Sequence, residues 1–330
     1  MRSGFCLGLV ALIGLAFVAQ GASPATGDYT WHDTPGKYFE LKHGDRPVLR
    51  YMYAAFDDTS PATREATFKV YHHLFDPSGS RLVTNGPSGL YPHHRGLFFG
   101  FNKISYGDKK CDIWHGDSAH KFNTIGAYQE HVKMLAQRGG SDSGTHTALI
   151  AWHGPDRGVF AEEERTVIAR HTNNGVLVDW SSKLTSKVDV PVKLDGDPQH
   201  AGFHFRADNE VNEKSKKETY YVRPDGPGNR GETRNWEPKT KKGPVNLPWD
   251  AMSFVLGDKR YTVVYLDHPA NPKESRHSER DYGRMGSYFE STLTKEKPLK
   301  VRYQIWLQEG EMTVGQAGEL SRRFTTQAEH

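Results

Sequence analysis

The chain has 330 residues, which is long enough to bury the core of one large domain. Its 43 lysine and arginine residues nearly balance 40 aspartate and glutamate residues, which argues against general nucleic-acid binding. Beyond residues 1–21, no apolar stretch is long enough to cross a membrane as a helix.

The N-terminus is typical of a signal peptide. Arg2 precedes the apolar run 5–18, and small residues lead up to a cleavage position before Ala22. We therefore expect residues 1–21 to be removed and the mature protein to be periplasmic or secreted, with no membrane span. Cys111 is then the only cysteine, so an intramolecular disulfide is excluded, and a buried apolar role is the simplest interpretation.

Most of the remaining chain consists of short segments with alternating apolar and polar residues, a pattern typical of β-strands. In chain order these segments are 37–42, 47–55, 67–73, 81–84, 96–104, 123–135, 146–153, 159–171, 176–186, 202–207, 251–256, 261–267, 287–293 and 300–307. Only 313–324 has the apolar spacing of a helix. We therefore predict an all-β protein, a large antiparallel β-sandwich with one short C-terminal helix, as a single domain over 22–330.

The segment 208–250 is the longest irregular stretch. It contains two lysine-rich runs, but Trp236 and Trp249 indicate that it is partly packed. Loops of this length in a compact domain are usually functional or disordered. Since it directly follows the segment 202–207, we expect it to lie near that strand.

The segment 200–206 combines an apolar face with a polar one. If it is a strand, one face carries Ala201, Phe203 and Phe205, and the other carries His200, His204 and Arg206. The apolar face belongs on a core, and the polar face is interpreted as the floor of a cleft. His200 and His204 would be about 13 Å apart on a strand, too far to share a metal ion. One of them could still bind zinc, iron or copper together with His93 or His94.

A second segment, 91–95, also contains two histidines and an arginine. If it is extended, His93 and Arg95 share one face and His94 lies on the other, although a turn at Pro92 would relax this. Histidine transfers protons near neutral pH, and arginine binds carboxylates or sulfates. The pattern therefore suggests a site that joins the two segments.

Other polar clusters are less specific. Asp112 and Trp114 share a face if extended, which is a frequent sugar-binding pair, but Trp114 is equally plausible in the core. His268 begins a proline-rich loop, and 280–282 collects an arginine, an aspartate and a tyrosine. These two loops either line the mouth of the cleft or stabilise themselves through an Arg–Asp pair. The segment 195–197 is interpreted as a polar turn rather than a calcium site.

Four segments resemble a known family in order and spacing: HHRGLFFG at 93–100, GFHFR at 202–206, DHPANP at 267–272 and RDYG at 280–283. This is the family of exported bacterial proteins, frequent in planctomycetes, that is labelled methane oxygenase PmoA-like. The resemblance covers nearly all of the mature chain. It implies a large β-sandwich similar to the galactose-mutarotase-like supersandwich of many carbohydrate-active proteins. The methane monooxygenase subunit of that name is an integral membrane protein, so the label is not adopted as a function.

The leading hypothesis is an exported carbohydrate-active enzyme, a lyase, hydrolase or epimerase that acts on a sugar or oligosaccharide. His94 and His204 are predicted to transfer protons, without a metal or other cofactor. The predicted substrate-binding residues are His93, Arg95, Asp112, Trp114, His200, Arg206, His268, Arg280, Asp281 and Tyr282. Two alternatives stay open. One is a non-catalytic periplasmic sugar-binding protein, and the other is a metal-dependent oxygenase whose iron or copper is held by two or three of His93, His94, His200 and His204.

Overall fold

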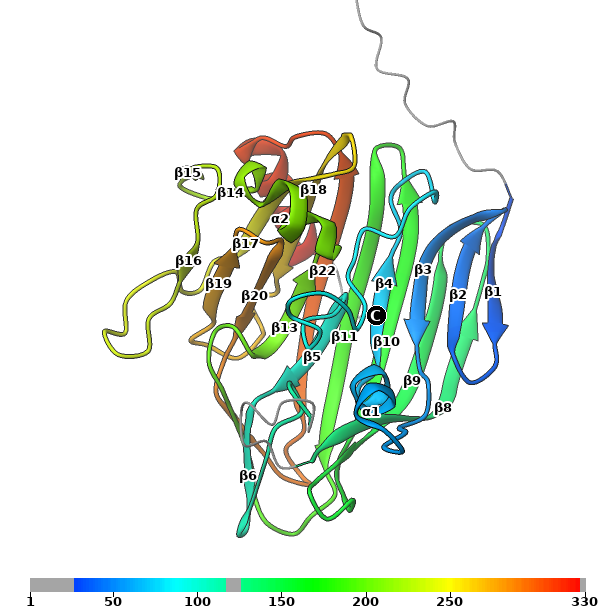
Figure 1. Ribbon diagram of the computed structural model, residues 1–330, viewed down its shortest axis with the longest axis vertical. Coiled ribbons are helices and arrows are strands. Elements are labelled where there is room, and N and C mark those ends of the chain that lie inside the picture. Colours follow the sequence, from blue (N-terminus) through cyan, green and yellow to red (C-terminus); the bar gives the residue numbers. More distant parts are fainter. Residues whose placement is uncertain (1–26, 117–125, 327–330) are drawn as a thin grey trace, which may run out of the picture.

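The computed structural model describes residues 27–116 and 126–326. The expected signal peptide, residues 1–21, and the start of the predicted strand 123–135 lie outside the described residues. Within the described part, two large sheets pack face to face, and Figure 1 shows β1 to β3 at one end of the molecule and β14 to β20 at the other.

The first sheet has nine strands. In spatial order they are β1 (Tyr29–Thr34), β2 (Tyr38–His43), β3 (Arg46–Met52), β4 (Tyr71–Leu74), β5 (Leu97–Phe101), β13 (Ala201–Arg206), β20 (Arg284–Tyr288), β19 (Arg276–Arg280) and β16 (Arg234–Asn235). All neighbouring strands in this sheet are antiparallel.

The second sheet also has nine strands. In spatial order they are β15 (Gly226–Pro227), β14 (Tyr220–Arg223), β17 (Trp249–Leu256), β18 (Lys259–Asp267), β22 (Leu299–Glu309), β11 (Gly175–Ser186), β10 (Val159–Thr172), β9 (Gly144–His153) and β8 (Tyr128–Arg138). A small third sheet contains β21 (Ser291–Leu293), β12 (Val192–Asp195), β6 (Lys103–Tyr106) and β7 (Lys109–Cys111).

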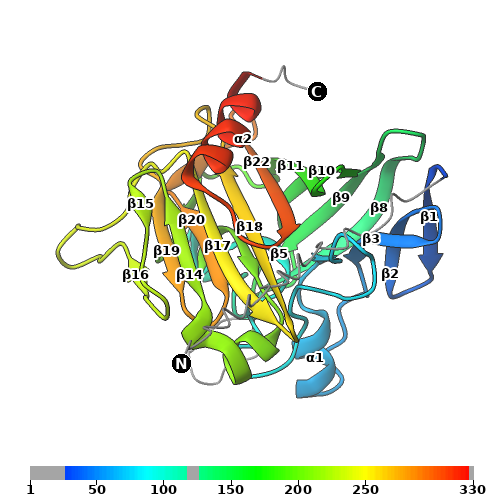
Figure 2. The same ribbon diagram turned by 90° about the horizontal axis from the view of Figure 1, so that it is seen from above.

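Helices are few. Helix α1 (Pro61–Thr67) is capped by Ser60, and helix α2 (Val314–Thr326) packs Ala317 and Phe324 against the second sheet. Figure 2 shows α2 beside this sheet from above. Short π-helical and 3₁₀ turns, Val211–Ser215 and Lys216–Glu218, follow β13. None of the described helices is long and apolar enough to cross a membrane.

The core lies between the two large sheets. Phe203 of β13 stacks on Trp180 and Tyr303 of the second sheet, with ring centroids 4.5 and 4.8 Å apart, and Phe205 of β13 contacts Phe254. Because side chains alternate along a strand, His204 and Arg206 then lie on the opposite, outer face of the first sheet. The predicted division of this strand into an apolar and a polar face is therefore confirmed for these side chains.

The all-β architecture, the antiparallel sandwich and the C-terminal helix are confirmed. Two strand predictions need correction. Of the segment 67–73 only the last three residues lie in a strand, β4, and 81–84 forms only isolated bridges. At 91–96 the alternative of a turn at Pro92 is the one found, because this segment is a turn and loop that precedes β5. The irregular segment 208–250 contains the short strands β14 to β16.

Candidate metal centre

Three histidines from three separate segments converge on the outer side of the first sheet. His93 lies in the turn before β5, His115 follows β7, and His200 lies in the turn before β13. One side-chain nitrogen of each lies within 4.8 Å of those of the other two. Ligand nitrogens around a tetrahedral metal ion lie roughly 3.4 Å apart, at metal–nitrogen distances of about 2.0–2.1 Å. Small side-chain rotations therefore bring all three to a single ion.

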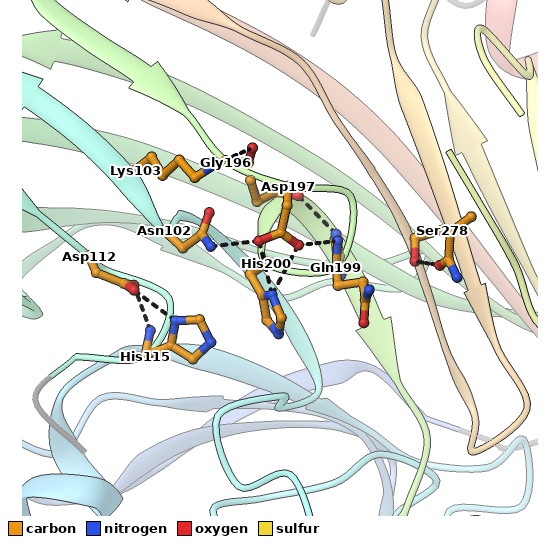
Figure 3. Close-up of polar contacts among 12 residues, drawn as sticks. Asn102, Lys103, Asp112, His115, Gly196, Asp197, Gln199, His200 and Ser278 are labelled. Atoms are coloured by element: carbon orange, nitrogen blue, oxygen red, sulfur yellow. Dashed lines mark hydrogen bonds and ion pairs between the residues drawn. The ribbon is translucent and has the colours of Figure 1, made fainter. Parts of the chain in front are cut away.

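Two of these histidines are oriented by carboxylates (Figure 3). Asp112 accepts hydrogen bonds from the backbone N–H of His115 at 2.8 Å and from its Nδ1 at 2.7 Å. Asp197 accepts from Nδ1 of His200 at 3.0 Å. When Nδ1 donates, the lone pair of the neutral ring is on Nε2. A carboxylate behind a histidine in this way is typical of metal sites, because it fixes the ring and raises its basicity.

The second carboxylate is itself held in place. Asp197 also accepts from the backbone N–H of Gln199 at 2.9 Å and from the side-chain amide of Asn102 at 2.7 Å. The side chain of His200 is 19% exposed and that of Asp197 is 28% exposed, so the cluster reaches the surface on this side. Solvent or a ligand can therefore approach His200.

A buried lysine ties two of the segments together. Nζ of Lys69 donates to the backbone carbonyls of His93 and Trp114, at 2.6 Å each. Burial, the largest effect, lowers the pKa of Lys69 well below its usual range, while its ring contact with Phe98 lies at 3.9 Å. This lysine therefore sets the relative positions of the loops that carry His93 and His115.

The environment favours neutral imidazoles. Burial lowers the pKa of His93, and the neighbouring His115 and His200 lower it further. Burial also lowers the pKa of His200, although the hydrogen bond to Asp197 acts in the opposite direction. Neutral imidazole is the form that binds metal ions, so both rings are in the ligating state at neutral pH.

Below this cluster lies a layer of buried polar groups on β13 and β20. Nη1 of Arg284 donates to Nδ1 of His204 at 3.1 Å, and Nε2 of His204 donates to the carbonyl of Ala201 at 2.9 Å. The indole of Trp114 lies on His204, with ring centroids 4.6 Å apart. Both nitrogens of His204 are thus engaged by the protein.

The sequence matches one family over residues 38–322, a span that includes every residue of the site described above. The chain belongs to DUF6807, a family of unknown function. The match does not carry the PmoA-like label, so only membership in a family of unknown function is shown. No curated protein matches the sequence.

Several solved structures are similar to this DUF6807 chain at a low level. The Slr1438 protein from Synechocystis sp. PCC 6803 is 7% identical, with 91% of this chain and 100% of that chain covered and a TM-score of 0.41. A galactose mutarotase related enzyme from Lactobacillus acidophilus is 11% identical, with coverage of 86% and 98% and a TM-score of 0.37.

A third similar structure is the heparan sulfate lyase HepC from Pedobacter heparinus. It is 9% identical and has a TM-score of 0.35. The alignment covers 89% of this chain but only 38% of the lyase. Scores of this size carry no argument about function, and the site has to be interpreted from its own residues.

Most of the residues predicted from the sequence surround the three histidines. The ring of His94 is stacked on His200 at 5.2 Å, and the edge of Trp114 faces His94 at 5.8 Å. Tyr282 contacts Tyr91 at 4.8 Å and lies under the guanidinium of Arg206 at 4.9 Å. Trp114 is only 1% exposed, so in this structure it packs beneath the histidines rather than at the surface.

Other predicted residues lie at the rim or away from the cluster. Nη2 of Arg280 donates to the side-chain oxygen of Gln199 at 2.5 Å, and Asp281 follows it with its backbone N–H near Thr233. Arg95 is fully buried and donates to Glu65 of α1 at 2.8 Å. His268 contacts Phe324 of α2, at 5.2 Å between ring centroids, so it belongs to the packing of the second sheet.

Sequence reasoning missed His115 and the orienting role of Asp197. A signal for both exists, because Asp112 precedes His115 by three residues and Asp197 precedes His200 by the same interval. The repeated Asp-x-x-His spacing, in which the carboxylate can turn back onto Nδ1, would have singled out these two pairs. The missed Arg284 has no comparable signal, since only the pairing of β13 with β20 places it beside His204.

Proposed function

We propose that this DUF6807 protein is a metal-dependent enzyme whose metal ion is held by His93, His115 and His200, and that its substrate is a sugar or oligosaccharide. One observation carries the proposal. Three histidine nitrogens from distant segments lie within 4.8 Å of one another, and carboxylates orient two of the rings through Nδ1. A purely structural cluster has no need of such convergence in a partly exposed position.

Three neutral imidazoles suit zinc, iron, copper or nickel. They leave the full charge of a divalent ion in place and leave at least one coordination position open. An ion held in this way polarises a substrate oxygen or lowers the pKa of a bound water molecule. Hydrolysis, elimination and epimerisation of sugars all benefit from this kind of activation.

His94 is the residue that we assign to proton transfer. Its Nδ1 is buried and has no hydrogen-bond partner among the described residues, and its ring is stacked on His200. A substrate bound at the metal would therefore lie within reach of an imidazole that the protein has not already engaged. His204, by contrast, is hydrogen-bonded at both nitrogens, which favours a role in positioning Arg284.

The rim of the site suits a polyhydroxylated substrate. The half-buried ring of Tyr91 lies beside His93 and His94, each at 6.1 Å between centroids, and can stack on the C–H face of a sugar. The side chain of Arg280 can donate to hydroxyl groups, and the amide of Gln199 can donate to them or accept from them. A periplasmic or secreted location is part of the proposal and rests on the expected signal peptide.

The test is turnover with a panel of sugars and oligosaccharides, with product detection before and after chelation. We expect activity that is lost on removal of the metal, restored by one divalent ion, and absent in His115→Ala. His153→Ala is the matched control, because this histidine packs on Tyr128 and bonds to the carbonyl of Arg157 instead. Turnover that survives both chelation and His115→Ala would contradict the proposal, and a redox-active iron or copper would favour the oxygenase alternative.

A further inference from the structure

Three arginines on the outer face of the first sheet have no carboxylate partner among the described residues. They are Arg206 of β13, Arg280 of β19 and Arg284 of β20. Arg284 is completely buried, and its nitrogens donate only to neutral groups. These acceptors are the hydroxyl of Tyr282 at 3.3 Å, Nδ1 of His204 at 3.1 Å and the hydroxyl of Ser278 at 2.7 Å. A buried charge without a counterion is unfavourable, so a compensating anion is expected.

Other buried or half-buried arginines of the protein do pair with carboxylates. On the same strand as Arg280, Arg276 donates to Glu290 at 2.7 Å and to Glu274 at 3.0 Å. Between the sheets, Arg165 pairs with Glu163 at 2.8 Å. Arg206, Arg284 and Arg280, in contrast, lie opposite one another on three adjacent strands beside the candidate metal centre, and their shared lack of a carboxylate partner requires a separate explanation.

Arg280 is the arginine best placed to meet a ligand. It is half-buried, its side chain donates to the amide oxygen of Gln199 at 2.5 Å, and its Nε is buried with no acceptor among the described residues. Gln199 lies between Asp197 and His200, whose side chains are hydrogen-bonded to each other. The N–H group of Arg280 that has no acceptor is thus held close to the turn that carries His200.

The charges near the site point to the class of ligand. A divalent ion would add two positive charges to neutral imidazoles, and Asp112 and Asp197 would offset those two. The arginines would then still lack a counterion. Arg284 lies directly opposite Arg280 in the pairing of β19 with β20 and opposite Arg206 in the pairing of β13 with β20, so the three positive charges are neighbours on one face of the sheet.

We propose that the substrate carries an oxyanion group, either the carboxylate of a uronic acid or a sulfate ester, and that Arg280 binds this group within the positive field of Arg284. The planar guanidinium donates two parallel hydrogen bonds to such a group. This inference rests on the proposed function for the contact between the sugar and the metal, but the arginine contact can be measured independently.

The experiment compares the binding of glucuronate, glucose 6-sulfate and glucose by calorimetry, with metal-free and metal-loaded protein. We expect at least one of the two anionic sugars to bind about ten- to a hundredfold more tightly than glucose, and the two anions distinguish a carboxylate from a sulfate site. Arg280→Gln should remove this preference. Arg280→Lys keeps the charge but loses the two parallel N–H donors of the guanidinium, so it should retain part of the preference. Arg276→Gln should retain all of it.

Equal affinity for charged and neutral sugars would overturn the inference, and so would a failure of both anionic sugars to bind. An equal loss of preference in Arg276→Gln would also overturn it, because the effect would then be a general one of surface charge. The metal content of the same samples separates the two proposals. An anion preference without any metal binding contradicts the proposed function alone, and stoichiometric metal without an anion preference contradicts this inference alone.

Discussion

Asp112 and Asp197 are the residues that turn a group of histidines into a preorganised centre. Each carboxylate holds a ring that would otherwise rotate about χ1 and χ2, and each lies three residues before its histidine. The Asp197 carboxylate has further donors from Gln199 and Asn102, so its own position is fixed. Metal affinity should therefore depend on these carboxylates as well as on the imidazoles.

The first prediction concerns these carboxylates. Asp112→Asn and Asp197→Asn should each weaken metal binding by about ten- to a hundredfold, because the amide can no longer polarise and orient the ring as a carboxylate does. Titration of metal-free protein with Zn²⁺ measures the change. Asp189→Asn is the control, since the side chain of this residue is 92% exposed and pairs with Lys295, away from the histidines. Unchanged affinity in both site variants would contradict the assigned role.

Arg95 has a structural role that its sequence context does not reveal. It is completely buried and bonds to Glu65 at 2.8 Å and to the carbonyl of Pro92 at 2.8 Å, so it ties α1 to the turn that carries His93. Replacement leaves Glu65 without its partner. Arg95→Gln should therefore lower the free energy of unfolding by about 3 kcal/mol, as measured by urea denaturation. An unchanged midpoint with a selective loss of sugar binding would instead support a substrate contact.

At the scale of the element, alternation along β13 was predictable because it follows from strand geometry alone. For the segment around Pro92 the sequence left an extended chain and a turn as alternatives. The turn closes through the His94 N–H and the Tyr91 carbonyl at 3.0 Å, and Lys69, more than twenty positions away, holds the carbonyl of His93, a contact that local patterns do not reveal. Helix α1 was not predicted from the sequence, although Ser60 and Thr63 form a reciprocal cap around its first residues. The helix is only seven residues long, and so it has no clear apolar periodicity.

A glycine on β20 makes room for the polar layer of the site. A Cβ at Gly286 would lie 2.3 Å from Cδ2 of His204 and 2.4 Å from the carbonyl oxygen of Phe203. Since the second atom belongs to the backbone of the neighbouring strand, it cannot move aside easily. Gly286→Ala should destabilise the protein by roughly 1–3 kcal/mol.

A matched substitution in α2 provides the control. At Gly318 nothing lies within 4 Å of an added Cβ. Gly318→Ala should therefore leave stability unchanged or raise it by up to about 1 kcal/mol, since alanine favours the helix. Thermal unfolding of both variants tests the pair, and equal effects would show that the space around Gly286 is not the limiting factor.

At the scale of the whole molecule, the site depends on which strands become neighbours. The antiparallel pairing of β5 with β13 places Leu97 opposite Phe205 and Phe101 opposite Ala201, so β5 begins at the end of β13 that is farther from His200. The segment before β5 returns toward the other end, where the rings of His93 and His200 lie 5.5 Å apart although the residues are more than a hundred positions apart in the sequence. Pairing of β6 with β7 and with β12 brings His115 to the same place. Local patterns predicted the strands and several of the residues, but the strand order that assembles the three histidines is a property of the complete fold.

The fold also buries several histidines away from the site. Burial lowers the pKa of His146 and His277 to about 3 and that of His73 to about 4, from a usual value of 6.5. These rings stay neutral in the folded protein, whereas the unfolded chain takes up protons below pH 6.5. Stability contributed by this difference is therefore complete above pH 6.5 and is lost as the pH falls toward the folded-state values.

Unfolding measured between pH 7.5 and pH 5 tests this prediction. The free energy of unfolding should fall by up to about 1.4 kcal/mol per pH unit for each such histidine below pH 6.5. His146→Gln should reduce the slope, and His32→Gln, at an exposed position, should not. A stability that is constant from pH 7.5 to pH 5 would contradict the neutral, buried state of these rings.

The most direct test of the central claim is the metal content of the untagged, purified protein by mass spectrometry, compared among the native chain, His115→Ala and His153→Ala. The account predicts about one transition-metal ion per chain in the native protein and in His153→Ala, and a loss of that ion in His115→Ala while the fold is retained. A well-folded native protein that neither contains a metal ion nor takes one up at micromolar concentration would contradict it.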